Sequence, residues 1–470
     1  MLIQEIAAKV QAGELKATEL VKEAIAKAEK LADYHTLLHI TKDRALERAV
    51  EIDARVAKGE NIGVLAGVPF VNKDNILAFD GATTASSRML KGFKAPLQAT
   101  VIDKLESAGA ICIGKANLDA FAHGSSTENS DFGPSKNAVN PEYVPGGSSG
   151  GSASAVALGI VPFALGTDTG GSIRQPASFN GVVGVKPTYG LVSRFGAIAM
   201  SSSADTIGCF TRNATDADLV LSVMAGQDER DMTTYKSNYK VHTKSTEKPK
   251  IAVVKQFMGD GVDTEVLART KRAIEKLTQA DYEVDEIDIP ELKYALAIYY
   301  IVVSAEVASN LARYDGVRYG FSSDKAKGID QVFKLSRSEG FNTENKRRII
   351  IGNYVLASGY YDAYYLKAQR VRTLLIEALK TAFKKYDFLI GAVTPTPAFK
   401  FGKNSADPMT MYMQDVMTTP ANLTGTPAIS LPNGLTGGGL PVGLQVLADI
   451  NHDAELLAFA KQIESVLEDK

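Results

Sequence analysis

Two stretches rich in glycine and serine lie close together in the chain: PGGSSGGSASA at 145–155 and GTDTGGSIRQP at 166–176. Glycine lowers the stability of helices and strands, so such a cluster needs a reason, for example a backbone that must approach a ligand closely. A flexible linker fits poorly, because apolar sequence typical of packed structure follows the first stretch at once. A phosphate-binding P-loop needs a Lys-Ser or Lys-Thr pair after its glycines, and neither stretch has one.

The remaining interpretation is a serine nucleophile at Ser172. The glycines that precede it in TDTGGS allow backbone N–H groups to converge into an anion-binding concavity, which acyl transfer requires for its oxyanion. Ser172 also needs a base, and none of the five histidines stands in a GxSxG context. A desolvated lysine could serve, and Lys73 ends an apolar strand-like stretch, although a single lysine is more often a solvated surface group.

The elements that must position these residues alternate between helix and strand, which predicts an α/β fold. The polar, lysine-rich stretch 228–250 indicates a surface excursion, which could either link two domains or join strands of one sheet. The pattern predicts helices over 1–60, a buried strand within 65–75, a helix and strand over 99–117, a helix at 361–386, strands at 387–393, 428–432 and 443–448, and a helix at 453–467.

Composition limits the possible partners. The 470-residue chain has 52 Lys and Arg against 54 Asp and Glu, so its net charge of −2 gives no bias toward nucleic acid. Cys112 and Cys209 lack the spacing of a zinc site or a disulfide framework, and the N-terminus lacks the pattern of a signal or transit peptide. We therefore expect no bound metal and a cytoplasmic protein. The uncharged stretch 143–167 indicates a buried helix and strand, because glycine, serine and Pro162 interrupt it.

Lys73, Ser148 and Ser172, together with GGSSGGS and GTDTGGSIRQPASFNGVVGVKPTYG, resemble the amidase signature family. The resemblance implies a Ser–cis-Ser–Lys triad. In it Ser172 is the nucleophile, Ser148 is the bridging serine that follows a cis peptide bond after Gly147, and Lys73 is the base. Neutral Lys73 would take a proton from Ser148, which would take one from Ser172 as this serine attacks an amide carbon.

The same resemblance implies an oxyanion hole built from the N–H groups of Thr169, Gly170 and Gly171, with Asp168 and Arg174 bracing the loop as scaffold. It also implies one large domain over residues 1–470, with a mixed β-sheet flanked by helices. An N-terminal helical segment at about 1–60 and a signature core at about 65–210 belong to this domain.

Later stretches, including 307–320, 343–375 and 407–432, resemble the glutaminase subunits of tRNA-dependent amidotransferases. The resemblance implies that Tyr299, Arg348 and Asp415 bind glutamine, and Arg348 suits its α-carboxylate as Asp415 suits its α-ammonium. It implies two partner subunits, called B and C, in a heterotrimer. Glutamate-charged tRNA(Gln) would bind mainly to the B subunit. The complex would use ATP and Mg²⁺, with no cofactor on this chain.

In DAFAHGSS at 119–126, Ala120 and His123 depart from a DEFAMGSS-like pattern. A pocket histidine could tune the fit of the substrate, but a packed or hydrogen-bonded histidine is the commoner case. Two other functions remain open. A stand-alone amidase for another small amide would turn over without partners, and a non-catalytic scaffold would have lost a triad residue, whereas all three are present.

Overall fold

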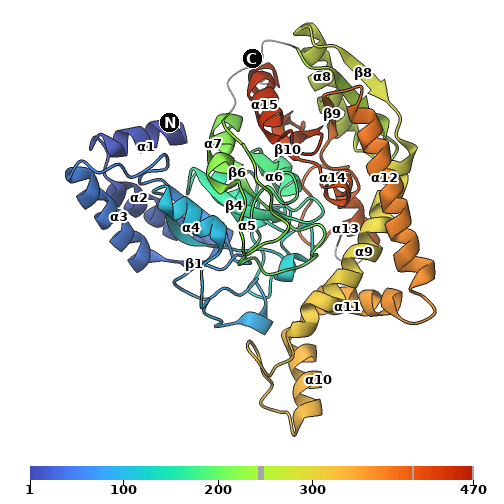
Figure 1. Cartoon of the computed structure of the whole chain (residues 1–470), viewed down its shortest axis with the longest axis horizontal. Helices are drawn as coiled ribbons and strands as arrows, with labels where there is room; N and C mark the ends of the chain where they lie inside the picture. The colour runs from blue at the N-terminus through green and yellow to red at the C-terminus, as the bar shows by residue number, and fades with distance from the viewer. Residues whose placement is uncertain (242–247, 405–406, 468–470) are drawn as a thin grey trace.

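The computed structural model describes residues 1–241, 248–404 and 407–467 (Figure 1). One mixed sheet of eleven strands runs through this part of the chain, in the order β1-β3-β2-β4-β6-β5-β10-β11-β9-β7-β8. β2 is parallel to β3 and β4, and β7 is parallel to β8 and β9, whereas the other neighbouring strands pair antiparallel. The predicted α/β class with a mixed sheet flanked by helices is confirmed.

The strands are β1 (Leu37–Ile40), β2 (Pro69–Lys73), β3 (Ile111–Ala116), β4 (Phe163–Asp168), β5 (Val183–Lys186), β6 (Thr206–Thr211), β7 (Ile251–Val254), β8 (Val284–Ile287), β9 (Phe388–Ala392), β10 (Ala428–Leu435) and β11 (Pro441–Ala448). The α-helices are α1 (Ile3–Gln11), α2 (Ala17–Lys30), α3 (Lys42–Ala57), α4 (Thr100–Ser107), α5 (Gly150–Ala157), α6 (Arg174–Asn180), α7 (Ala214–Met224), α8 (Thr264–Gln279), α9 (Ala295–Asn310), α10 (Ile329–Gly340), α11 (Thr343–Leu356), α12 (Lys367–Phe383), α13 (Pro408–Tyr412), α14 (Thr419–Thr424) and α15 (Asp453–Leu467).

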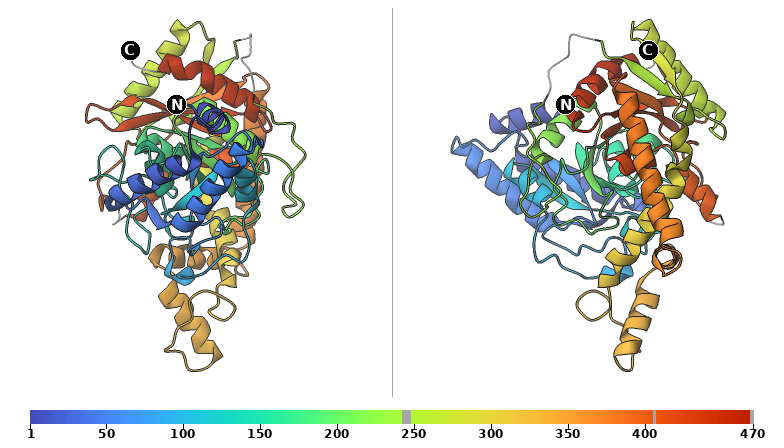
Figure 2. Two further views of the ribbon diagram at one scale, coloured as in Figure 1. Left: turned by 90° about the vertical axis from the view of Figure 1, so that its left-hand side faces the viewer. Right: turned by 45° about the vertical axis from the view of Figure 1, so that its right-hand side comes forward.

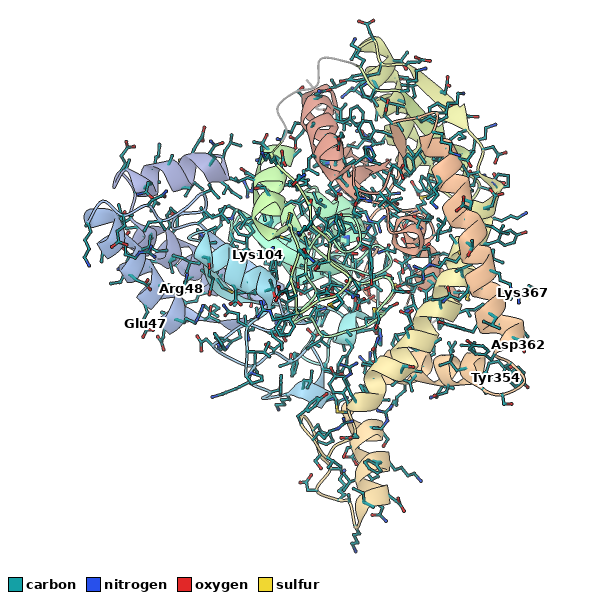
Figure 3. All side chains as sticks on the ribbon, in the orientation of Figure 1. Glu47, Arg48, Lys104, Tyr354, Asp362 and Lys367 are labelled. Carbon is teal, nitrogen blue, oxygen red and sulfur yellow. The ribbon has the colours of Figure 1, made fainter. Side chains whose placement is uncertain are left out.

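Helices gather at both ends of the sheet. The N-terminal helices α1, α2 and α3 lie at one end, and α8 with β8 lies toward the other (Figure 1). Helix α10 projects from the rest of the molecule in all views (Figure 2). The α11–α12 corner also lies at the periphery, where Tyr354, Asp362 and Lys367 mark its outer end (Figure 3). At the centre of the sheet, between the two groups of helices, β5 from the first half of the chain pairs with β10 from the second half.

Several predicted elements agree with the structure. Strand β2 lies within the predicted stretch 65–75, α4 and β3 fill 99–117, and α15 spans the predicted 453–467. The helix predicted at 361–386 starts with a π-helical turn, Asp362–Leu366, before α12. The stretch predicted as helical over 1–60 also contains β1, a short apolar strand that takes the sheet edge beside β3.

The predicted surface excursion at 228–250 begins with an anchored turn, because the Asp228 carboxylate accepts hydrogen bonds from the Ser193 and Thr100 hydroxyls. Its residues 242–247 lie outside the described part of the chain. Both cysteines are free and buried. Among the described helices, one apolar stretch, Pro290–Arg313, is long enough to cross a membrane, and 56% of its most apolar window is buried inside the protein, as in a core helix.

Candidate active site

The sheet brings the expected triad to one edge. β2 and β4 are parallel neighbours, so their carboxyl ends meet, and Lys73 is the last residue of β2. Ser172 lies in the turn that leads from β4 into α6, and Ser148 lies just before α5. The backbone N–H of Ser149 donates to the Ser172 carbonyl at 3.2 Å, which ties the two serine segments together.

Lys73 is buried and surrounded by hydroxyl groups. Its Nζ lies 2.8 Å from Ser148 Oγ and 2.8 Å from Thr167 Oγ1, and the Asn75 side-chain amide donates to the same threonine oxygen at 3.1 Å. Burial lowers the pKa of Lys73 to about 7, even though three nearby carboxylates, those of Asp119, Asp168 and Asp205, act to raise it. A substantial fraction of Lys73 is therefore neutral near pH 7 and able to accept a proton.

The two serines differ in exposure. Ser148 is fully buried and follows a cis peptide bond to Gly147, as the resemblance implied, whereas Ser172 is partly exposed. Of the two contacts that the expected relay needs, the one between Lys73 and Ser148 is formed. No hydrogen bond between the Ser148 and Ser172 hydroxyls is present in the described part of the chain, so only the first link of the expected relay is closed.

Asp168 and Arg174 brace the nucleophile loop, as predicted. Arg174 donates from Nη2 to Oδ1 and from Nε to Oδ2 of Asp168, each at 3.0 Å, and both side chains are fully buried. Burial alone would raise the pKa of Asp168, but Arg174 outweighs it and lowers that pKa to about 2. The ionised carboxylate also accepts the Gly171 N–H at 2.8 Å, which pins the loop in place.

This contact affects the expected oxyanion hole. The N–H of Gly171 faces Asp168 and would have to turn away from it to reach an oxyanion. The N–H groups of Thr169, Gly170 and Ser172 have no acceptor among the described residues. Gly171 has a φ of +136°, in the region that favours glycine, so a side chain at this position would strain the loop.

Tyr299, on α9, packs directly on this loop. A methyl group at Gly170 would lie 2.5 Å from the Tyr299 hydroxyl oxygen, so residue 170 must be glycine for the ring to fit. Tyr299 is buried, and burial raises the pKa of its phenol above the usual value, which keeps it protonated at neutral pH. The structure thus places one of the three expected substrate-binding side chains beside the nucleophile turn.

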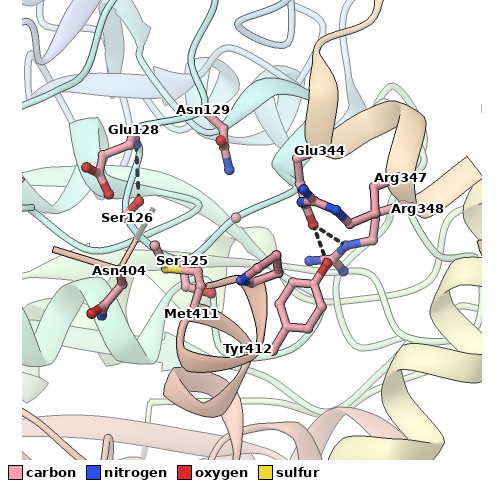
Figure 4. A pocket seen from close by; sticks show the side chains of 12 residues that line it. Ser125, Ser126, Glu128, Asn129, Glu344, Arg347, Arg348, Asn404, Met411 and Tyr412 are labelled. Carbon is pink, nitrogen blue, oxygen red and sulfur yellow. Dashed lines mark hydrogen bonds and ion pairs between the residues drawn. The ribbon is translucent and has the colours of Figure 1, made fainter. Parts of the chain in front are cut away.

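Arg348, on α11, is held by an acidic and aromatic frame (Figure 4). Its Nε donates to Glu344 Oε1 at 2.7 Å, and the Tyr412 hydroxyl donates to the same oxygen at 2.9 Å. The guanidinium carbon lies 4.7 Å and 4.9 Å from the ring centres of Tyr300 and Tyr412. Its Nη1 is buried and has no hydrogen-bond partner among the described residues.

Asp415 is also buried, on the short helical turn Met413–Asp415. The Ser125 hydroxyl lies 2.9 Å and 3.0 Å from its two carboxylate oxygens, and the Tyr300 hydroxyl donates to Oδ2 at 3.3 Å. Burial raises the pKa of Asp415 to about 7, against the opposing effects of Ser125 and Arg348. Tyr300 therefore bridges the two expected charge-recognition residues, because it contacts both Asp415 and Arg348.

A cavity of about 100 Å³ opens onto this group from outside. Helices α11 and α13 and the loop after β3 form its walls, and Figure 4 shows Glu344, Arg348 and Tyr412 along one side. Of the predicted glutamine-binding residues, Arg348 lines the cavity, and Asp415 lies behind its wall, in contact with the lining residue Ser125. The lining residues are Gly124, Ser125, Ser126, Glu128, Asn129, Glu344, Arg347, Arg348, Asn404, Pro408, Met411 and Tyr412.

The two unusual residues near this cavity belong to one hydrogen-bonded group. Asn345, on α11, donates from its side-chain nitrogen to the Ala120 carbonyl at 2.9 Å, and the same nitrogen lies 2.6 Å from His123 Nδ1. Burial, followed by the charge of Arg348, lowers the pKa of His123 well below its usual value, so this histidine is neutral. His123 is thus packed and hydrogen-bonded, the commoner of the two cases considered.

Sequence reasoning missed several residues around the site. Thr167 stands inside the glycine-rich GTDTGGS stretch, and Ser125 stands in the GSS stretch, so both were close to recognised motifs. Tyr300 directly follows a predicted site residue. Glu344 lies four residues before Arg348 on α11, a spacing that the sequence shows, whereas Tyr412 carries no local signal, because it reaches Glu344 from a distant segment. No cluster of three or more His, Cys, Asp or Glu that could hold a metal occurs among the described residues.

A family model described as Amidase matches residues 19–457, and the chain belongs to this family. It is similar to the A-subunit of glutamyl-tRNA(Gln) amidotransferase from Koribacter versatilis, with 48% identity over 93% of this chain and 92% of that protein. The corresponding protein of Heliobacterium modesticaldum is 47% identical, covering 96% and 93%. The crystal structure of the Thermotoga maritima A-subunit superposes with a TM-score of 0.79 at 37% identity, covering 96% of this chain and 91% of that one.

Proposed function

We propose that this chain is the glutaminase subunit of a tRNA-dependent amidotransferase. It hydrolyses glutamine to glutamate and ammonia, and the ammonia passes to a partner protein that converts Glu-tRNA(Gln) to Gln-tRNA(Gln). The full-length similarity to glutamyl-tRNA(Gln) amidotransferase A-subunits supports this assignment. The observation that supports glutamine as the substrate is the buried Nη1 of Arg348. This nitrogen has no partner in the described residues and can donate to an α-carboxylate.

Recognition of the substrate uses opposite charges on the two sides of Tyr300. Arg348 takes the α-carboxylate of glutamine, and Asp415 takes its α-ammonium. Both groups are buried, so each gains from a charged partner that replaces lost water. The ammonium also favours the ionised form of Asp415, whose pKa burial raises to about 7 in the free protein. Tyr299 covers the loop beside the side-chain amide.

The chemistry runs through the Lys73–Ser148–Ser172 relay. Neutral Lys73 accepts the Ser148 proton while Ser148 accepts the Ser172 proton, and Ser172 Oγ forms a bond to the amide carbon. The carbonyl electron pair moves to oxygen, and the open N–H groups of the 169–172 turn stabilise it. The relay returns the proton to nitrogen, the C–N bond breaks, and ammonia leaves. Water then attacks the acyl group and releases glutamate.

The partner subunits bind the tRNA and activate its glutamyl group. The B and C subunits complete a heterotrimer, Glu-tRNA(Gln) binds mainly to B, and ATP and Mg²⁺ act on the partner side to activate the glutamyl group. The even balance of charges on this chain agrees with a division in which another subunit binds the tRNA. We place the complex in the cytoplasm and keep residues 1–470 as one catalytic domain.

Amide hydrolysis by the purified chain tests the proposal, measured as ammonia release for every amide with the chain alone and as glutamate release for glutamine in the complex. Glutamine is compared with propionamide and benzamide, first with the chain alone and then with the B and C subunits, Glu-tRNA(Gln) and ATP. We expect glutamine to be preferred and its turnover to rise when the partners are present. Equal turnover of amides that lack an amino-acid head, with no effect of the partners, would instead identify a stand-alone amidase.

A further inference from the structure

Thr418 lies between the nucleophile loop and the segment that carries Asp415. Its hydroxyl donates to the Gly170 carbonyl at 2.6 Å, and its backbone N–H donates to the Asp415 carbonyl at 3.1 Å. Thr418 is fully buried, so water does not compete for these bonds. Its side chain also fills the space where a Cβ at Gly171 would stand, so it packs on the loop as well as bonding to it.

The bond to Gly170 completes the restraint of one peptide group. The carbonyl of Gly170 and the N–H of Gly171 belong to the same planar unit. The carbonyl is held by Thr418, and the N–H is held by Asp168 at 2.8 Å. With both ends fixed by buried partners, this plane cannot rotate without breaking a hydrogen bond.

The two anchors are themselves joined. Arg174 binds the Asp168 carboxylate and also donates from Nη1 to the Thr418 carbonyl at 2.9 Å. A closed ring of contacts therefore runs from Asp168 through the Gly170–Gly171 peptide to Thr418 and back through Arg174. Each member is buried. Thr418 contributes a neutral hydroxyl to this ring, whereas Asp168 and Arg174 contribute charged groups.

The restrained peptide lies between the donors that remain open. The N–H groups of Gly170 and Ser172, on either side of it, have no acceptor among the described residues. The orientation of the Gly170–Gly171 peptide plane sets the directions in which these two N–H groups point. Oxyanion donors accelerate a reaction because they are already aimed at the developing charge, so a loosened plane would weaken them without removing any of them.

We propose that Thr418 is a positioning residue that sets the oxyanion turn through its hydroxyl bond to the Gly170 carbonyl. Thr418 does not touch the reacting atoms and acts through Gly170 and its neighbours. This inference rests on the proposed hydrolysis at Ser172. It concerns transition-state stabilisation rather than binding of the substrate.

Replacement of the hydroxyl by a methyl group removes this bond, together with the longer contact of the same hydroxyl with the Asp415 carbonyl at 3.1 Å. Thr418→Val keeps the shape, and Thr418→Ser keeps the hydroxyl as the matched control. For glutamine hydrolysis we expect Thr418→Val to lower kcat about 10-fold to 100-fold with KM within about threefold. The reason is that the variant weakens the preorganised stabilisation of the oxyanion and leaves substrate binding intact. Thr418→Ser should restore most of kcat.

A second measurement separates positioning from packing. A boronic acid analogue of glutamine, with B(OH)₂ in place of the side-chain amide, accepts the Ser172 oxygen and forms a tetrahedral adduct whose oxygen occupies the oxyanion site. Its inhibition constant should rise in Thr418→Val by the same factor as kcat/KM falls, and recover in Thr418→Ser. The inhibition constant of glutamate, the product, should stay constant, because glutamate needs no tetrahedral centre.

The inference is overturned if Thr418→Val matches the unsubstituted protein in kcat and boronate inhibition. It is also overturned if Val and Ser variants lose activity equally, with KM and glutamate inhibition raised together. If Thr418→Val does not fold, as judged by thermal melting, Thr418→Ala against Thr418→Ser carries the same comparison. Failure of the unsubstituted chain and complex to hydrolyse glutamine would reject the proposed function instead, and the Thr418 series would then be run with the amide that is hydrolysed.

Discussion

The ring of Tyr299 lies against Gly170, so close that no side chain fits at position 170. The tyrosine comes from α9, in the second half of the chain, whereas Gly170 belongs to the turn that holds the nucleophile. A residue expected to contact the substrate therefore also forms a wall of the reaction centre. Because Tyr299 serves both, binding and catalysis are better separated by substitutions at other residues of the site.

Ser172→Ala should abolish glutamine hydrolysis while the protein stays folded. Ser172 is the proposed carrier of the acyl group, and loss of a nucleophile lowers kcat by several orders of magnitude. Glutamate release measures the effect, with thermal melting as the control for folding. Added ammonia should still support tRNA amidation by a complex that contains the variant. Near-normal glutamine hydrolysis by Ser172→Ala would show that the nucleophile lies elsewhere.

The activity should rise with pH through about 7. Lys73 must be neutral to accept a proton, and burial lowers its pKa to about 7, so protonation below this value removes the base. The carboxylates that face it, Asp119, Asp168 and Asp205, oppose this shift and keep the midpoint from falling further. A profile of kcat against pH checks the midpoint. Lys73→Arg should be almost as inactive as Lys73→Ala, because guanidinium does not lose its proton in this range.

Asp415→Asn should raise KM for glutamine more than it lowers kcat. A charge-assisted hydrogen bond contributes about 1.5–3 kcal/mol, which corresponds to roughly a tenfold or larger rise in KM. Arg348→Lys should also raise KM, because lysine lacks the paired donors of guanidinium. Steady-state kinetics with glutamine and propionamide provide the measurement and its control. An equal effect on both substrates would argue against recognition of the amino-acid head.

Arg174→Gln should destabilise the whole fold. The substitution leaves the Asp168 carboxylate buried without its cation, and breaking a buried ion pair costs about 3–5 kcal/mol in free energy of unfolding. Lys380→Gln removes one half of an exposed pair with Glu377 and should change that free energy by only about 0–1 kcal/mol. Urea denaturation compares the two variants. Similar stability in both would mean that the Asp168–Arg174 pair is dispensable.

The isolated chain should bind tRNA weakly, yet be required for glutamine-dependent amidation. Its 52 basic and 54 acidic residues leave no surplus of positive charge to displace counterions from a phosphate backbone. Filter binding at two salt concentrations tests this, with the assembled complex as the positive control. Tight binding by the chain alone that weakens steeply with salt would contradict the charge argument.

The sequence was most informative where chemistry and local pattern coincide. The alternation of helix and strand predicted the α/β class, and the amphipathic pattern at 453–467 predicted α15 within its observed bounds. Strand β1 was missed, because LLHI is short and its stability comes from pairing with β3 rather than from its own pattern. β5 and β8, which have four residues each, were missed for the same reason, and the longer β6 was also not predicted.

For the site, Lys73 was recognisable as the end of an apolar strand, but its base character depends on burial by the whole fold. Arg348 and Asp415 could be chosen only through family resemblance, since surface charges share their local sequence. Thr418 and Tyr300 were missed for a further reason: their partners are Gly170 and Asp415, and such contacts between elements cannot be read from one segment.

The triad and the oxyanion turn come from residues 73–172, whereas Tyr299, Arg348 and Asp415 come from α9 and beyond. On the proposed function, bond breaking therefore depends on the earlier stretch of the gene and choice of substrate mainly on the later one, with Ser125 of the earlier stretch supporting Asp415. Recombination or drift in the later stretch can change which amide is accepted while the groups that cleave it are inherited intact. The exceptions are Tyr299 and Thr418, which contact the turn itself and so constrain how far the later stretch can diverge.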